Sequence, residues 1–351
     1  MTLPHSRHII AFMAATVAIL LLSCGSDRHN TPQGNAIYYW RTTLSLSPQE
    51  RTALAGLDIK AIYLHMFDIR EKDGELRPTS TLIFNYTIPE NIEIVPVVFI
   101  EPSALNGTAS TDSLADRIIS RVDRMLTLNG YPRPSEVQID FDWTLRNRDL
   151  YYGILRRAYE VLHSEGRILS TTIRLHQLSQ PVPPVDYGVL MVYNVGRITN
   201  PDETNSILSR ETVRPYLKAL HKYTLPLATA LPVYSWDIVF SDNCFKAIAH
   251  SLTLSDTTAF HPVGDNWFRA MRYGPLAMAG SRDGSGGRLF PGDMVRHEFV
   301  TPATLSAVRD DIRHAAPDAT NRIILYHLDE KSLNQYDTQF LQTILDGSSR
   351  R

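Results

Sequence analysis

Apolar and polar residues alternate along short segments of the chain that are rich in Val, Ile, Tyr and Phe. The alternation is strictest in residues 137–144, VQIDFDWT, and such alternation is typical of a strand whose successive side chains point to opposite faces. Eight segments of this kind predict strands at 36–42, 60–69, 93–100, 136–143, 168–175, 187–194, 226–236 and 322–329. The pattern therefore predicts a protein in which eight strands recur along the chain.

Segments with helical spacing separate most of these strands. Ser47 followed by Pro48 is a typical helix start, and apolar residues recur at helical spacing from Leu114 until Gly130 ends the pattern. Eight strands alternating with helices predict an α/β fold, a (β/α)8 TIM barrel over residues 36–346. A doubly wound open sheet is the alternative, but no Gly-rich phosphate loop follows the first strand. Residues 241–300 are too long for a plain loop and predict a small insertion after the seventh strand.

The amino terminus resembles a bacterial export signal. Arg7 precedes an apolar run at 9–22, which is shorter than the ~20 residues that span a bilayer. The run ends in Leu-Leu-Ser-Cys, which resembles a lipobox whose cysteine, Cys24, is acylated after cleavage. We therefore expect a signal peptide at 1–23, a polar tether at 24–35, and a protein anchored in the cell envelope, with the outer membrane as the expected location. An ordinary signal peptide with a chance cysteine is the alternative.

The composition and charge argue against several partners and cofactors. The formal net charge is −2 and no basic run occurs, which argues against nucleic acid as a partner and leaves the lipid as the expected membrane contact. Two cysteines exclude a zinc cluster built on thiolates, and the histidines show no metal-ligand spacing, so we expect neither a metal nor another cofactor. With Cys24 acylated, Cys244 has no partner for an intrachain disulfide.

Acidic and aromatic residues gather where the predicted strands end. Because barrel active sites lie at the carboxyl ends of the strands, these residues are candidates for substrate binding. Aromatic rings cover the apolar faces of sugars, while acids and amides bind sugar hydroxyls, so the set predicts a glycan or oligosaccharide as the partner. The candidates are Trp40, Asp68, Glu101, Tyr193, Asn194, Tyr234 and Trp236.

Two carboxylates share one face of the fourth predicted strand. Asp140 and Asp142 lie roughly 7 Å apart at about 3.3 Å of rise per residue. Two buried acids need partners, and a pair of carboxyl groups is what glycosidic bond cleavage uses. The alternative is that both are paired with inward arginines or lysines inside the barrel.

The strand ends resemble family 18 glycoside hydrolases, the chitinase-like barrels. VQIDFDWT is similar to the fourth-strand signature DxxDxDxE of that family, and three later segments resemble its sixth, seventh and last strands. They are MVYN at 191–194, LPVYSW at 231–236 and IILYHLDE at 323–330. The resemblance implies a barrel, an insertion after the seventh strand, and a site built on Asp140, Asp142 and Tyr193. The chain also resembles bacterial secreted lipoproteins that carry the IDFDWT strand and a PGDxxR element, here Pro291 to Arg296.

This chain departs from the family pattern at three positions that bear on catalysis. Val137 stands where the family has its first aspartate, and Asn194 replaces the aspartate that follows its sixth-strand tyrosine. Thr144 stands where the family has the glutamate that protonates the leaving oxygen. A threonine hydroxyl is far too weakly acidic to replace that group at neutral pH. Chitinase chemistry by the family route is therefore not expected.

Two functions remain. The favoured prediction is a divergent glycoside hydrolase in which Asp142, beside Asp140, pairs with an acid of the last strand, Asp329 or Glu330. Alternation would turn His327 and Asp329 inward if Ile324, Tyr326 and Leu328 face the helices. The alternative is a glycan-binding lipoprotein that kept the barrel and lost catalysis.

Overall fold

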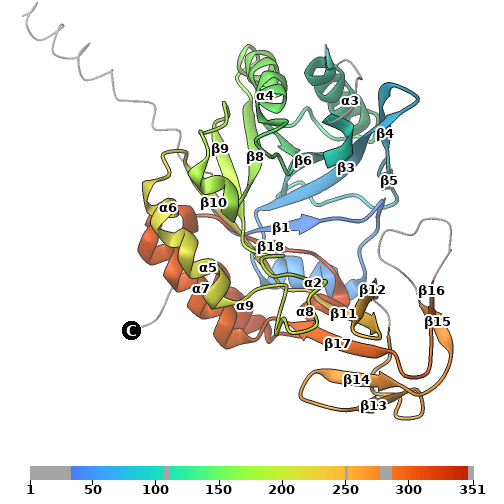
Figure 1. The fold of residues 1–351 in the computed structure, drawn as a ribbon. Coiled ribbons are helices and arrows are strands. Elements are labelled where there is room, and N and C mark those ends of the chain that lie inside the picture. Colours follow the sequence, from blue (N-terminus) through green and yellow to red (C-terminus); the bar gives the residue numbers. More distant parts are fainter. Residues whose placement is uncertain (1–32, 106–110, 112, 250–251, 277–286, 347–351) are drawn as a thin grey trace, which may run out of the picture. The chain divides into compact units, whose positions relative to one another are not determined.

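Eight parallel strands form the centre of the computed structural model, which describes residues 33–105, 111, 113–249, 252–276 and 287–346 (Figure 1). They run in the order β1, β3, β6, β7, β8, β9, β10 and β18, and β1 pairs with both β3 and β18, so the sheet closes on itself. The predicted (β/α)8 barrel is thus confirmed, and the open doubly wound sheet is excluded. The strands are Ala36–Tyr39, Ala61–Lys72, Glu93–Ile100, Glu136–Asp140, Ile168–Arg174, Tyr187–Met191, Leu227–Pro232 and Ile323–Tyr326.

The two faces of each strand differ as the alternation predicts. In β7 and just beyond it, Val137, Ile139, Phe141 and Trp143 are fully buried against the helices, and Gln138 and Asp140 point into the barrel. Alanine, valine and tyrosine side chains from the other strands fill the interior around them. Both sides of the barrel wall are therefore buried, which is usual for a parallel sheet covered by helices.

A chain of polar contacts crosses the barrel interior near the amino-terminal ends of the strands. The Glu136 carboxylate accepts hydrogen bonds from Ser170 (2.5 Å) and Tyr187 (2.6 Å), and the Tyr187 hydroxyl lies 2.6 Å from that of Tyr63. Arg322 donates to the Tyr63 hydroxyl at 3.2 Å. Burial raises the pKa of Glu136 to about 7, although the hydrogen bonds from Ser170 and Tyr187 oppose this effect. An acid inside the barrel is therefore poised to titrate near neutral pH.

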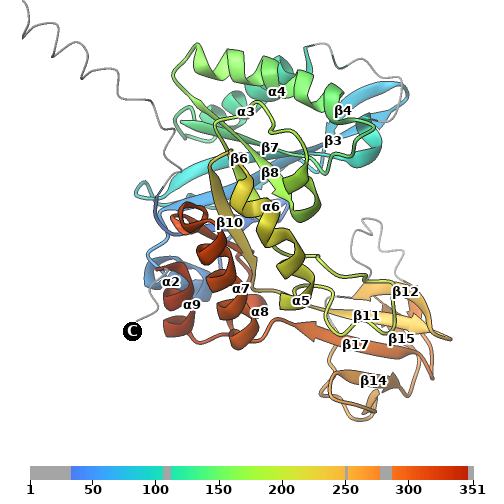
Figure 2. The same ribbon diagram turned by 60° about the vertical axis from the view of Figure 1, so that its left-hand side comes forward.

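The helices follow the strands in the order expected of the fold. Ser47 caps the first, α2, and its hydroxyl accepts from the Glu50 amide while the Glu50 carboxylate accepts from the Ser47 amide, which is a complete capping box. Figure 2 shows α6 beside α7 and α7 beside α9, in agreement with their contacts. The helices are Pro48–Gly56 (α2), Leu114–Leu128 (α3), Arg148–His163 (α4), Arg210–Val213 (α5), Leu217–Lys222 (α6), Pro302–Ala315 (α7), Glu330–Leu333 (α8) and Thr338–Leu345 (α9).

Shorter elements replace a helix at two crossovers. Between β3 and β6, the chain forms the antiparallel strand β4 (Glu75–Thr79) against β3 and the two-residue strand β5 (Ile83–Phe84). β5 pairs with the two-residue strand β2 (Thr43–Leu44), which lies between β1 and α2. Between β8 and β9 it forms a single 3-10 turn, Leu175–Ser179. Further 3-10 turns span Pro102–Leu105, Arg214–Tyr216 and Pro317–Thr320.

A five-stranded antiparallel sheet lies between β10 and α7, where an insertion is predicted. Its first strand, β11, begins at Ser235, so the predicted seventh strand at 226–236 covers all of β10, a two-residue link and the start of β11. The strands are β11 (Ser235–Ser241), β12 (Cys244–Ala249), β13 (Phe260–Pro262), β14 (Trp267–Ala270) and β17 (Met294–Phe299), with β15 (Gly274–Leu276) and β16 (Gly287–Leu289) as a separate hairpin. Cys244 is an exposed free thiol.

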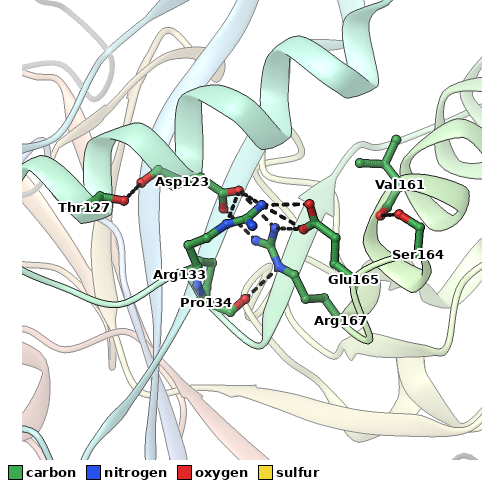
Figure 3. A network of polar contacts seen from close by, with 8 residues as sticks. All are labelled: Asp123, Thr127, Arg133, Pro134, Val161, Ser164, Glu165 and Arg167. Atoms are coloured by element: carbon green, nitrogen blue, oxygen red, sulfur yellow. Dashed lines mark hydrogen bonds and ion pairs between the residues drawn. The ribbon is translucent and has the colours of Figure 1, made fainter.

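Charged side chains join two loops at the amino-terminal end of the barrel (Figure 3). Asp123 of α3 binds both Arg133 (2.7 Å) and Arg167 (2.7 Å), and Glu165 binds the same two arginines at 2.8 and 2.9 Å. Arg167 is buried and also donates to the Pro134 carbonyl at 2.8 Å. Because barrel active sites lie at the opposite end, we assign this network to stability.

The chain enters the barrel at this same end. The Arg322 guanidinium, at the start of β18, donates to the Gln33 carbonyl at 2.8 Å, just before β1. The predicted signal peptide, Cys24 and most of the tether lie outside the described residues. None of the described helices combines the length and the apolar character needed to cross a membrane.

Candidate active site at the carboxyl end of the barrel

A cleft of about 940 Å³ opens at the carboxyl ends of β1, β3, β9, β10 and β18. It brings together six of the residues predicted from the sequence, namely Trp40, Asp68, Asn194, Tyr234, Trp236 and Asp329. Five others do not line it: Glu101, Asp140, Asp142, Tyr193 and Glu330. The lining also includes His327, which alternation turned inward, and residues that the sequence did not indicate, among them Arg41, His65, Ser80, Tyr326 and Lys331.

Aromatic side chains from four strands pack around Tyr326 at the base of the cleft. The Tyr326 ring stacks on Tyr193 with 4.6 Å between centroids, and it contacts Tyr234 at 5.7 Å and Trp40 at 6.1 Å. Tyr234 in turn contacts Trp236 at 5.4 Å. Burial raises the pKa of Tyr193, Tyr234 and Tyr326 above the ordinary tyrosine value, so all three stay neutral phenols. We call these five side chains the aromatic wall.

Tyr326 corrects the predicted orientation of the last strand. Ile324 and Tyr326 face the barrel interior, whereas Leu328 packs with the outer core. The assumption that all three side chains face the helices is therefore wrong for Ile324 and Tyr326. His327 and Asp329 nevertheless line the cleft, because the strand ends at Tyr326 and its strict alternation does not continue into the residues that follow. Alternation could not settle the orientation, since both faces of this strand are apolar and buried.

Asp68 forms the polar side of the cleft. It lies 2.8 Å from Nε2 of His65, accepts a hydrogen bond from the Ser80 hydroxyl, and lies 3.7 Å from the Arg70 guanidinium. Burial by itself would raise the pKa of Asp68, but the hydrogen bonds from His65 and Ser80 and the nearby positive charges outweigh it and lower the pKa. Asp68 is therefore an ionised acceptor. The indole of Trp40 lies over the His65 ring, 4.8 Å between centroids.

Asp140 and Asp142 have different surroundings. Asp140 is buried and accepts hydrogen bonds from the Thr172 hydroxyl and, at 3.1 Å, from Arg174. This is the ion pair that the sequence left open as the alternative for an inward acid. Asp142 follows the strand end with nearly half of its side chain exposed, 3.8 Å from Nε2 of His176 and 3.4 Å from the Gln177 amide.

Two other predicted acids have structural partners, and a third begins a helix. Asp329 caps α8 by accepting from the Ser332 amide at 3.0 Å, and Glu330 is the first residue of that helix. Glu101 pairs with Arg70. Whether any of these acids takes part in a reaction stays a prediction. The sequence did carry a signal for Asp329, because Asp is among the residues preferred at a helix N-cap.

No group of three or more His, Cys, Asp or Glu side chains within the described part of the chain is arranged to hold a metal ion.

Solved structures of three other proteins have a similar fold. The C-terminal domain of a candidate chitinase from Desulfitobacterium hafniense is 13% identical, covers 90% of this chain and 100% of its own, and has a TM-score of 0.54. The spore cortex-lytic enzyme SleL of Bacillus megaterium is 12% identical over 90% of this chain and 75% of its own, with a TM-score of 0.52. The Group IV chitinase of Ostrinia furnacalis is 12% identical over 90% of this chain and 99% of its own, with a TM-score of 0.50. This chain shares the barrel fold of these proteins.

At such low identity the similarity establishes the fold alone, a (β/α)8 barrel. Sequence comparison finds no matching protein family and no matching curated protein. The position that the family resemblance assigns to the proton donor, Thr144, is exposed, and both its amide and its hydroxyl donate to Asn147 Oδ1, at 2.8 and 3.3 Å.

Proposed function

We propose that the protein binds a glycan in the cleft at the carboxyl end of its barrel. The observation that carries this proposal is the aromatic wall, which brings Trp40, Tyr234, Trp236 and Tyr326 to one cleft beside polar groups. Aromatic rings cover the apolar faces of sugar rings, and neutral phenols donate hydrogen bonds to sugar oxygens. The ionised Asp68 supplies an acceptor for sugar hydroxyls on the opposite side of the cleft.

Binding accounts for the site without requiring a proton donor. Glycoside hydrolysis needs a carboxyl group that can protonate the leaving oxygen. Asp68 lines the cleft with a lowered pKa, Asp329 caps a helix, and Asp140 pairs with Arg174 outside the cleft lining. A glycan-binding role is therefore the first proposal, and hydrolysis is the second.

Trp40→Ala is expected to weaken glycan binding at least tenfold, because it removes the largest exposed ring of the aromatic wall, and anchors of this kind contribute about 1–2 kcal/mol or more. The measurement is calorimetric titration of the purified protein with chitotetraose, with soluble peptidoglycan fragments and with a broader glycan library. Tyr273→Ala is the matched control, because Tyr273 is 70% exposed on the insertion and outside the cleft. Equal affinity of the two variants for a glycan that the parent binds would contradict the assignment of the cleft.

Asp142 favours divergent glycoside hydrolysis as the second proposal. Its side chain is nearly half exposed after β7 and lies 3.8 Å from His176. An acid or base in hydrolysis has to be reachable by substrate or water, which this exposure allows, and the cleft contains Asp329 as an acid from the last strand. In this proposal Asp142 and Asp329 or Glu330 form the carboxyl pair.

For a hydrolase, Asp142→Asn is expected to lower turnover by about a hundredfold or more, the usual contribution of a positioned acid or base. Release of reducing ends from any glycan that binds is the measurement. Asp149→Asn removes a carboxylate that is 83% exposed on α4 and serves as the control. A parent protein that binds a glycan and never cleaves it would reject hydrolysis and leave the binding proposal intact.

We also propose that the protein is held in the cell envelope by a lipid on Cys24, on the basis of the sequence pattern. Cys24→Ser is expected to abolish incorporation of radiolabelled palmitate in the producing bacterium, because serine offers no thiol for acylation. Cys244→Ser, which removes the other cysteine, should label like the parent. Labelling of the Cys24→Ser variant at the parental level would reject the anchor.

A further inference from the structure

The insertion carries a buried ion pair that contacts Trp236 of the aromatic wall. Arg296 and Glu298, two residues apart on β17, both have fully buried side chains, and Arg296 Nε lies 2.7 Å from a Glu298 oxygen. The PGDxxR element supplies the arginine. A buried pair of this kind adds little stability in itself, because desolvation offsets the attraction between its charges. Its hydrogen-bond partners therefore indicate its role.

Glu298 receives its other hydrogen bonds from two directions. Trp236 stands directly opposite Glu298 across the β11–β17 pairing, and its indole nitrogen donates to the carboxylate at 2.8 Å. Ser206, in the loop that follows β9, donates from both its amide (2.9 Å) and its hydroxyl (2.7 Å) to the same oxygen. One carboxylate thus holds a residue that lines the cleft and a loop that leads from the cleft.

Arg296 fixes the same loop at a second point. Its Nη1 donates to the carbonyls of Asn200 (2.7 Å) and Pro201 (3.1 Å), and its guanidinium lies over the rings of Phe240 (5.1 Å) and Trp267 (5.5 Å). The guanidinium is therefore clamped between the sheet of the insertion and the loop. This geometry allows the arginine little freedom to move.

The loop itself begins at the cleft. Asn194, which lines the cleft, accepts a hydrogen bond from the Tyr234 hydroxyl, and two residues later the chain packs tightly on Ser206. A Cβ atom on Gly196 would lie only 2.8 Å from the Ser206 Cα, so a glycine is required for this approach. Three residues of the cleft, Asn194, Tyr234 and Trp236, are thereby connected to the ion pair.

We propose that Arg296 and Glu298 are positioning residues, through which the insertion sets the place of Trp236 and so the affinity of the cleft for its glycan. The inference rests on the proposed glycan-binding function. Neither residue lines the cleft, so an effect of either on binding has to pass through Trp236 or through the loop.

The test compares two isosteric changes within the insertion. Glu298→Gln neutralises the carboxylate that holds Trp236. Asp293→Asn neutralises a similarly buried carboxylate that instead binds Lys246 at 2.6 Å and the Phe290 amide at 2.8 Å, both within the insertion and outside the cleft lining. We expect Glu298→Gln to raise the Kd for chitotetraose, or for the best glycan of the library, at least fivefold. Asp293→Asn should leave it within twofold. Equal Kd values for the two variants and the parent would overturn the proposal.

A second measurement does not depend on a ligand. In a ¹H–¹⁵N spectrum the indole signal of Trp236, identified by its loss in Trp236→Phe, should shift and exchange faster with solvent in Glu298→Gln, and should be unchanged in Asp293→Asn. If the parent binds no glycan, the proposed function fails, and the indole signal alone decides the positioning role: an unchanged signal rejects it. If Glu298→Gln does not fold, Ser206→Ala removes one donor to the same carboxylate and should give a smaller change in the same direction.

Discussion

Asp140→Ala is expected to lower the free energy of unfolding by about 3 kcal/mol. The substitution leaves Arg174 without its carboxylate partner in a largely buried place, and removing one member of a buried ion pair costs about 3–5 kcal/mol. We take the lower end of that range because 22% of the Arg174 side chain is exposed. Urea unfolding followed by far-ultraviolet circular dichroism at pH 7 is the measurement.

The matched variant removes both charges. Asp140→Ala combined with Arg174→Met should recover at least half of the loss, because no unpaired guanidinium remains at the end of β8. If Asp140→Ala alone unfolds within about 1 kcal/mol of the parent, the ion pair does not hold this part of the barrel. That result would return Asp140 to the set of acids that are available for chemistry.

The stability of the barrel is expected to fall as the pH rises through neutrality, because of Glu136. Burial raises the folded-state pKa of this acid from 4.5 to about 7. Its protonated form is therefore favoured by folding, so the contribution is fully present below about pH 4.5 and is lost as the pH rises through about 7. The loss amounts to about 3 kcal/mol, from 1.36 kcal/mol for each tenfold change in the protonation equilibrium.

Glu136→Gln removes this titration and keeps the size of the side chain. Between pH 4.5 and 8, the unfolding free energy of the variant should gain about 3 kcal/mol relative to that of the parent, as measured by urea unfolding at each pH. Tyr187→Phe should move the loss to higher pH, because the Tyr187 hydroxyl donates to the carboxylate and lowers its pKa. A constant difference between Glu136→Gln and the parent across this range would refute the assignment.

The barrel could be predicted from the sequence because its strands alternate in polarity and its helices begin with recognisable caps, as at Ser47. The division of residues 226–236 into β10 and β11 could not be predicted, since no Gly or Asp marks the two-residue link. The orientation of Tyr326 was equally hidden, because both faces of β18 are apolar and largely buried.

The candidate site was only partly predictable. Strand-end position identified Trp40, Asp68 and Trp236, which do line one cleft. What a strand-end residue cannot reveal is its partner, because partners come from distant segments: Arg174 lies 34 residues after Asp140 in the sequence. A carboxylate that has no obvious partner in the sequence is often paired with a cation in the folded protein, because a buried charge needs one. Such a paired carboxylate is less available for catalysis.

The point at which the chain enters the barrel lies at the pole opposite the cleft. The Gln33 carbonyl accepts a hydrogen bond from Arg322 at the amino-terminal end of the strands, whereas the cleft opens at their carboxyl ends. The described residues that lead into β1 therefore take no part in lining the cleft. A glycan that enters the cleft is thus not expected to displace this segment or its contact with Arg322.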